Sequence, residues 1–176
     1  MKKKLAFTLF TALIVVALLC CACAKKEPSI LDYCDSISDA KSATQVITVK
    51  SGSDEIAKET LNYNFVTGKV SIERKTLNSS DADELYSIEM EIKDITNKAT
   101  VKLTKDLLKD VTETATTLKA TVSNANLNEV FGIASSDVVG DAKVEISAQD
   151  KQIVSIMVSY TSTNGNAIQV VTNYVY

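Results

Sequence analysis

The side chains that could do chemistry in this 176-residue chain are carboxylates, hydroxyls, lysines and four cysteines, because the chain contains no histidine. That absence excludes nucleophile–histidine pairs, HExxH sites and His/Cys zinc sites. Ser38 and Lys41 have the spacing of the S-x-x-K motif, but the S-D-N and K-T-G motifs that accompany it in penicillin-binding enzymes are missing. The five glycines are too scattered for a phosphate-binding loop. The sequence therefore predicts a protein that is not an enzyme and has no cofactor.

Two groups of acidic residues could bind a metal or act as a pair. Asp81, Asp83 and Glu84 offer hard oxygen ligands for Ca²⁺, but they lack the glycine and the terminal glutamate of a calcium loop. Glu89 and Glu91 fall on one face of a predicted strand, in the manner of a glycosidase carboxylate pair. A solvated loop and the wet face of a sheet contain such residues as well. We favour that interpretation and predict no metal site.

The first residues of the chain form a targeting signal. Lys2, Lys3 and Lys4 precede an uncharged run at 5–24, whose most apolar part is 9–19. A positive end, an apolar middle and small residues afterwards are the layout of a secretory signal peptide. A run of this length could also remain as a transmembrane helix. Either outcome places the rest of the chain outside the cytoplasm.

The end of this run, with the letters CCACA at 20–24, resembles the lipobox of bacterial lipoproteins. In those proteins, a cysteine that follows a small residue is lipidated and becomes the mature N-terminus. The resemblance implies lipidation of Cys23, with Cys21 as the alternative. We therefore expect a signal peptide at 1–22, a lipidated N-terminus with a short linker at 23–29, and a lipid anchor on the extracytoplasmic face of the cell membrane.

An anchor of this kind needs little from the protein beyond the cysteine. One acyl chain binds a membrane only marginally, at about 0.8 kcal/mol for each buried CH₂, whereas two chains attach a protein stably. Lys25 and Lys26 would each add about 1 kcal/mol of attraction to anionic headgroups. The linker at 24–29 spans at most about 20 Å, so it would keep the domain close to the membrane.

The remaining chain predicts a single domain at 30–176. A chain that begins at Cys23 has 154 residues and a net charge of −6, because three of the 19 basic residues and none of the 22 acidic ones lie in the signal. This charge gives no reason to expect nucleic-acid binding. Only Cys34 remains as a cysteine of the domain, so no disulfide within it is possible. At this length one core is sufficient for folding.

One helix and then a long series of strands must position any site. Apolar residues three and four apart predict an amphipathic helix at 30–42. After it the apolar period changes to two. The predicted strands are 45–50, 58–66, 69–77, 86–93, 99–103, 112–123, 141–148, 153–163 and 166–176. A helical turn or a bulged crossover is predicted at 105–111, and a short helix at 124–132.

Turn residues indicate that the strands follow one another as hairpins. A two-residue turn at 67–68 would pair Phe65 with Val70, a three-residue loop is predicted at 150–152, and the Asn-Gly pair at 164–165 predicts a type I′ turn. Clean alternation of apolar and polar residues is typical of antiparallel sheets with one wet face. We therefore predict a mainly β fold: a curved, half-barrel-like antiparallel meander with the N-terminal helix and one or two short helices packed on it.

The apolar face of the hairpins between 58 and 103 is the candidate ligand cavity. Alternation places nine side chains together: Leu61, Tyr63, Phe65, Ile72, Tyr86, Ile88, Met90, Ile92 and Val101. They line a pocket if their volume falls short of the space that the curved sheet encloses, and otherwise they form an ordinary core. Both interpretations remain open from the sequence.

The order of these elements is similar to that of a known family. The lipobox, the helix at 30–42 and the AKSAT passage at 40–44 into the first strand resemble the half-barrel lipoproteins of the LolA/LolB/LppX type. Those proteins hold an acyl chain or a lipidated partner between a curved sheet and its helices. The resemblance implies a membrane-anchored, non-enzymatic protein with such a ligand. The alternative is a module with a filled core that binds a protein or the cell wall.

Mass spectrometry of the protein extracted from membranes tests the anchor. We expect a mature N-terminus that carries diacylglycerol on Cys23 or Cys21, because the lipid is attached to a cysteine in this type of signal. An intact Met1 would contradict the lipoprotein interpretation and favour a retained helix.

Overall fold

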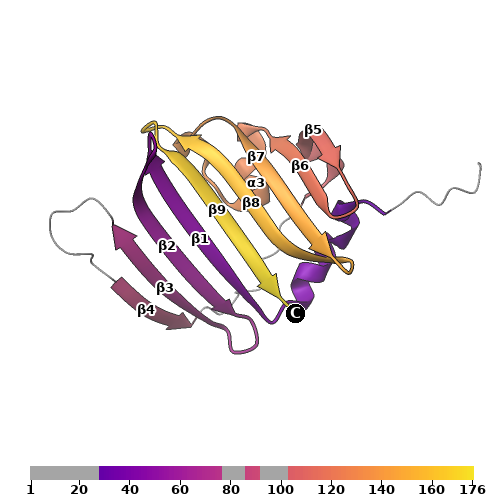
Figure 1. Ribbon diagram of the computed structural model, residues 1–176, viewed down its shortest axis with the longest axis horizontal. Coiled ribbons are helices and arrows are strands. Elements are labelled where there is room, and N and C mark those ends of the chain that lie inside the picture. Colours follow the sequence, from indigo (N-terminus) through magenta and orange to yellow (C-terminus); the bar gives the residue numbers. More distant parts are fainter. Residues whose placement is uncertain (1–27, 77–85, 92–102) are drawn as a thin grey trace, which may run out of the picture.

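One antiparallel sheet of nine strands dominates the part of the chain that this computed structural model describes, residues 28–76, 86–91 and 103–176. The strands lie in the order β4-β3-β2-β1-β9-β8-β7-β6-β5 (Figure 1). Their bounds are β1 (Ser42–Ser51), β2 (Asp54–Asn64), β3 (Lys69–Thr76), β4 (Tyr86–Glu91), β5 (Leu108–Glu113), β6 (Thr117–Val122), β7 (Val138–Gln149), β8 (Gln152–Ser162) and β9 (Ala167–Val175).

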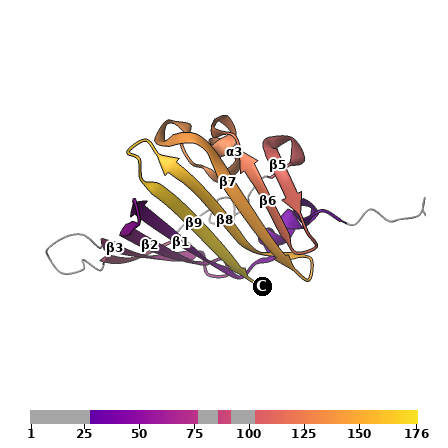
Figure 2. The same cartoon turned by 45° about the horizontal axis from the view of Figure 1, so that its top comes forward.

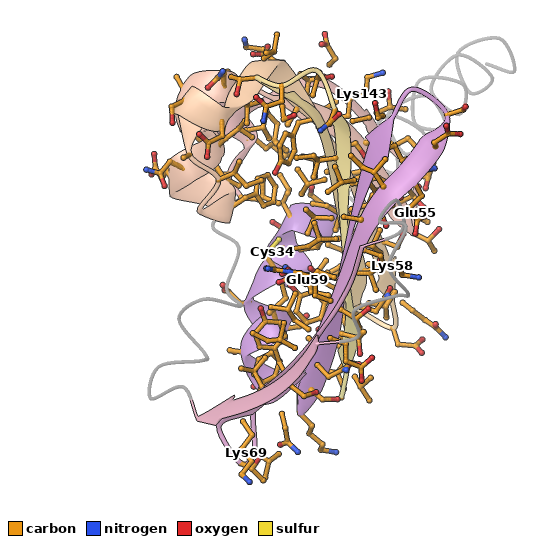
Figure 3. All side chains as sticks on the ribbon, turned by 90° about the vertical axis from the view of Figure 1, so that its left-hand side faces the viewer. Cys34, Glu55, Lys58, Glu59, Lys69 and Lys143 are labelled. Atoms are coloured by element: carbon orange, nitrogen blue, oxygen red, sulfur yellow. The ribbon has the colours of Figure 1, made fainter. Side chains whose placement is uncertain are left out.

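The sheet is curved and open, and the helices lie on its concave side. Figure 2 shows β1–β3 strongly inclined to β5–β9, and the two edge strands, β4 and β5, end the order without pairing to each other. Figure 3 shows the N-terminal helix on the hollow side of the sheet. The helices are η1 (Ile30–Asp39), η2 (Lys105–Leu107), η3 (Asn124–Asn126), α3 (Leu127–Phe131) and η4 (Ser135–Asp137). The predicted mainly β, half-barrel-like fold is confirmed.

The strand order corrects the expectation of one continuous meander. β1 pairs with β9, with Ala43 opposite Tyr174 and Ile47 opposite Val170. The first and last strands therefore lie side by side in the middle of the sheet, and two meanders, β1–β4 and β5–β9, meet there. Hairpin signals were misleading because they report only pairing between neighbours in the sequence, whereas this pairing joins the two ends of the domain.

The N-terminal helix, η1, is a 3₁₀ helix that begins with a capping box. The Ser29 amide donates to Asp32 Oδ2 (2.8 Å), and the Leu31 amide donates to Ser29 Oγ (3.4 Å). The helix ends at Asp39, three residues before the predicted end, because Ala40 is already extended. The Lys41 amide then donates to the Val175 carbonyl (2.7 Å), which starts the β1–β9 pairing.

The buried core lies between η1, the short helices and strands β6–β9. Ile30 and Ile37 of η1 and Leu127 and Val130 of α3 are buried in one cluster with the inward side chains of these strands. The alternation predicted for β6 is confirmed, since its three apolar residues are buried: Leu118, Ala120 and Val122. The half of the domain built from β5–β9 is therefore packed in the manner of an ordinary core.

The turn between β2 and β3 differs from the prediction. Asn64 Oδ1 accepts from the amides of Val66 (3.1 Å) and Thr67 (3.0 Å), so the turn has four residues, 65–68. Tyr63 is therefore opposite Val70, and Phe65 lies in the turn. The register shifts by two residues, which leaves every side chain on the predicted face.

Polar turn residues also divide the strand predicted at 112–123. The Thr114 hydroxyl oxygen accepts from the Thr116 and Thr117 amides (3.4 and 3.0 Å), so β5 ends and β6 begins within that stretch. Just before it, the predicted helical turn is present at 105–107, and the rest of the stretch belongs to β5. The 3₁₀ turn η2 is followed by a bulge in β5, at which Asp110 has a φ of 51°.

Two further loops depart from the predicted geometry. Asp150 and Lys151 form a two-residue loop, not the predicted three-residue one, with φ values of 51° and 65°, and a register irregularity beside it puts Ile153 on the core side. At 164–165 only the glycine has positive φ (80°), and its amide donates to the Ser162 carbonyl (2.8 Å). That geometry is a type I turn followed by a left-handed glycine, not a type I′ turn.

Replacing a core side chain tests this packing. Leu118→Ala is expected to lower the free energy of unfolding by about 2–5 kcal/mol, because it leaves a cavity in the buried cluster. Urea unfolding measures the change. Lys119→Ala, which removes an exposed ion pair with Glu145 on the opposite face, is the matched control and should cost less than about 1 kcal/mol. Equal effects of the two variants would contradict this assignment of the core.

Candidate functional site

The concave face of β2 and β3 brings together part of the predicted apolar set. Leu61 is opposite Ile72, and Tyr63 is opposite Val70, so these four residues share one face as expected. On β4, position 88 pairs with Ile72 and position 90 with Val70. The strand register thus places the predicted Ile88 and Met90 in the same two rows.

The remaining predicted site residues lie apart from these rows or outside the described residues. Phe65 belongs to the β2–β3 turn, where its ring stacks on Tyr63 with centroids 6.1 Å apart. Tyr86 pairs with Arg74 in the next row along the strands. Four predicted residues lie outside the described part of the chain: Ile92, Val101, and the lipidation candidates Cys23 and Cys21. Of the acidic groups, the one at 81–84 lies outside it as well.

Six aliphatic residues of the concave face form what we name the inner strip: Ile47, Val49, Leu61, Ile72, Ile168 and Val170. Each is half-buried, and none belongs to the buried cluster beneath η1. The sequence identified Leu61 and Ile72 as site residues. It missed the four on β1 and β9, because alternation in each strand was visible but the β1–β9 pairing that joins them was not.

Two polar pairs interrupt this apolar face. Gln45 Nε2 donates to Thr172 Oγ1 (3.1 Å) across the β1–β9 pair. Glu59 and Arg74 form an ion pair across β2 and β3, in which Arg74 Nη2 is 2.7 Å from Glu59 Oε2. Figure 3 shows Glu59 on the side of the sheet that carries η1, and Lys58 on the other side. Each of the two pairs thus joins neighbouring strands across the concave face.

Hydrogen bonds fix η1 against the sheet at one end of the concave face. The Tyr176 hydroxyl donates to the Ile153 carbonyl (2.8 Å) and lies 3.1 Å from Ser36 Oγ. The Ile153 amide donates to that same Ser36 Oγ (3.1 Å). Burial raises the pKa of the Tyr174 hydroxyl in this region. Hydrogen bonds of Ser36 and Tyr176 with the backbone of Ile153 therefore join η1 and the C-terminal residues to β8.

Neither Cys34, the one thiol among the described residues, nor the serine of the S-x-x-K motif is activated. Burial, and then the carboxylates of Asp35 and Asp32, raise the pKa of Cys34 to about 11. The Ser38 hydroxyl donates to the Asp35 carbonyl (2.7 Å) within its own helix. Within the described residues there is no group of three metal-ligating side chains, and no helix of this part is long and apolar enough to cross a membrane.

Two shallow hollows, of about 340 and 390 Å³, are lined mainly by residues of the outer strand positions. The first includes a row of polar side chains across four strands: Thr48, Gln169, Ser159 and Lys143. Tyr63 is the only predicted site residue that lines either hollow. Ile168 is the one inner-strip residue that lines the first hollow, and none lines the second.

Comparisons with known proteins add no family. No family model matches the chain, and no curated protein matches it. Among solved structures, the chain is similar to a redesigned β-barrel, mFAP1, bound to DFHBI, with 10% identity and a TM-score of 0.23 over 78% of this chain and 98% of that one. A TM-score this low carries no argument about function.

Thiol labelling tests the environment of Cys34. In a variant with serine at 20, 21 and 23, Cys34 should react with a disulfide reagent at pH 8 at least about tenfold more slowly than an exposed thiol, because the lower thiolate fraction outweighs the higher nucleophilicity that accompanies a raised pKa. The same shift makes stability fall as the pH rises from about 9 to 11, since the unfolded chain loses its proton first. Labelling as fast as that of a free thiol would contradict the burial of Cys34.

Proposed function

We propose that this protein binds an apolar ligand, an acyl chain or the lipid of a lipidated partner, on the inner strip of its half-barrel. The observation that supports this proposal is the division of the concave face. One half is filled by η1, α3 and buried side chains, whereas the inner strip is half-buried and lies outside that cluster. A concave, mainly apolar surface with a few paired polar groups is what ligand sites in proteins have in common.

Desolvation would drive such binding. An acyl chain that removes about 200 Å² of apolar surface from water gains about 5 kcal/mol, before the costs of association are subtracted. The hydrogen bond between Gln45 and Thr172 lowers the cost of covering these two polar side chains on that face. The interaction needs few directional contacts, and it needs no catalytic group.

We propose further that the domain works at the extracytoplasmic face of the cell membrane, held by a lipid on Cys23 or Cys21. Glu113 Oε1 accepts from Ser29 Oγ (2.8 Å) and from the Ile30 amide (2.6 Å), which fixes the start of the domain at the β5 edge. The linker to the lipid would therefore begin at the β5 edge of the sheet, and β4 forms the other edge. A lipid ligand and a membrane anchor place the protein next to the pool that supplies the ligand.

The second candidate function is an interaction module for a protein or the cell wall. The buried cluster beneath η1 favours it, since side chains fill that half of the concave face. The polar row on the outer face would then be one surface available to a partner.

Displacement of an uncharged fluorescent probe, N-phenylnaphthylamine, separates the two functions. We expect saturable binding by the wild type and at least about tenfold weaker binding by Ile47→Arg, which puts a charge on the inner strip. Val46→Arg is the matched control, because the neighbouring residue points to the outer face of the same strand. Urea unfolding of both variants shows that they are folded. If no apolar probe binds the wild type, the ligand proposal fails and the interaction module becomes the leading function.

A further inference from the structure

The Glu59–Arg74 ion pair is an unusual feature for the apolar side of a curved sheet. Strand register puts Glu59 between Ile47 of β1 and Arg74 of β3, one row from Leu61 and Ile72. Adjacent rows on one face are about 7 Å apart, so the ion pair adjoins the inner strip. Charged groups are costly to remove from water. Their presence here indicates that this part of the concave face stays in contact with a polar medium.

Among the residues that the structure describes, only Glu59 binds the Arg74 guanidinium, and it leaves one edge of that group available. Arg74 Nε (2.8 Å) and Nη2 (2.7 Å) both approach the same oxygen, Oε2 of Glu59. Glu59 thus occupies the side of the guanidinium that carries Nε, and Nη1 lies outside the pair. A guanidinium has five N–H donors, and its end-on edge can bind a second oxyanion in a fork.

The two partners differ in exposure, so the ion pair presents mainly its positive charge to an approaching ligand. The Arg74 side chain is 61% exposed, whereas that of Glu59 is only 22% exposed. A ligand that approaches over the inner strip therefore meets the positive member of the pair. Arg74 is also the only arginine in the chain, and a forked oxyanion contact requires an arginine, because lysine offers only a point charge.

We infer that the ligand of the inner strip is an amphiphile with an oxyanion head, a carboxylate or a phosphate, which binds the end-on edge of Arg74 while its chain lies on the strip. This inference rests on the proposed function, and it names the chemical class of the ligand. The aliphatic residues remove the chain from water, and Arg74 sets the position of the head.

Three amphiphiles with the same chain test this inference: dodecanoate, dodecyl phosphate and dodecanol, each displacing N-phenylnaphthylamine. We expect at least one of the two anions to bind the wild type about tenfold more tightly than dodecanol. Arg74→Met should abolish that preference and leave the affinity for dodecanol unchanged. Arg74→Lys should retain only part of it. The preference should also weaken as salt is added, because Arg74 is largely exposed. The anion that binds more tightly identifies the head as a carboxylate or a phosphate.

Lys58→Met is the matched control. It also removes one positive charge, but Lys58, which precedes Glu59 on β2, points to the outer face of the sheet (Figure 3). It should leave the anion preference intact. If both anions and dodecanol bind the wild type equally well, or if Lys58→Met lowers the preference as much as Arg74→Met does, the inference is wrong and the proposed function stands. If none of the probes binds the wild type, the proposed function itself fails. Urea midpoints close to that of the wild type show that the Arg74 variants are folded.

Discussion

The antiparallel pairing of β1 with β9 is the interaction on which the rest of this structure depends. Nine consecutive residue pairs join the two strands, from Ser42 opposite Val175 to Lys50 opposite Ala167. This pairing unites a meander that follows η1 with a meander that ends the chain. It also places Ile47 beside Val170, so the inner strip exists only when both ends of the domain are in place. Pairing between strands so far apart in the sequence costs chain entropy before the contacts form, so the two meanders are expected to fold together.

The two halves of the concave face differ because one helix covers only one of them. η1 packs mainly on β8 and β7, and it is fixed at its start by Glu113 and near its end by Ser36, Tyr176 and Ile153. Beneath it the side chains form a dry core. Beyond it, on β1–β3, the face keeps half-buried aliphatic residues and a salt bridge. The same sheet therefore combines a filled half with a half whose aliphatic side chains are only half-buried.

Polar side chains on the concave face are arranged to limit the cost of their desolvation. Gln45 bonds Thr172, and Glu59 bonds Arg74, each across a neighbouring pair of strands. Both pairs lie among aliphatic residues, and the charged pair lies toward the β3 side, where Arg74 is largely exposed. An unpaired charge in this place would bind water strongly and would repel ligands of the same charge. A paired charge, with its positive member outermost, is compatible with both an apolar chain and an anionic head.

The amino-acid sequence alone establishes the absence of histidine chemistry and the mainly β class. It also predicts which side chains face the core in strands such as β6, because alternation is a local property of an extended chain. It does not do so at the start of β8, where a register irregularity buries Ile153. It also predicted Leu61, Tyr63 and Ile72 on one face. Tertiary structure alone decided the β1–β9 pairing, the ion pair of Glu59 with Arg74 and the extent of the cover that η1 provides. The hydrogen bonds of the Asn64 side chain in the turn shift the β2–β3 register by two residues from the predicted one, so each side chain stays on its predicted face. Local periodicity cannot encode these features, because each depends on which distant segments meet, and that choice is made by packing of the whole domain.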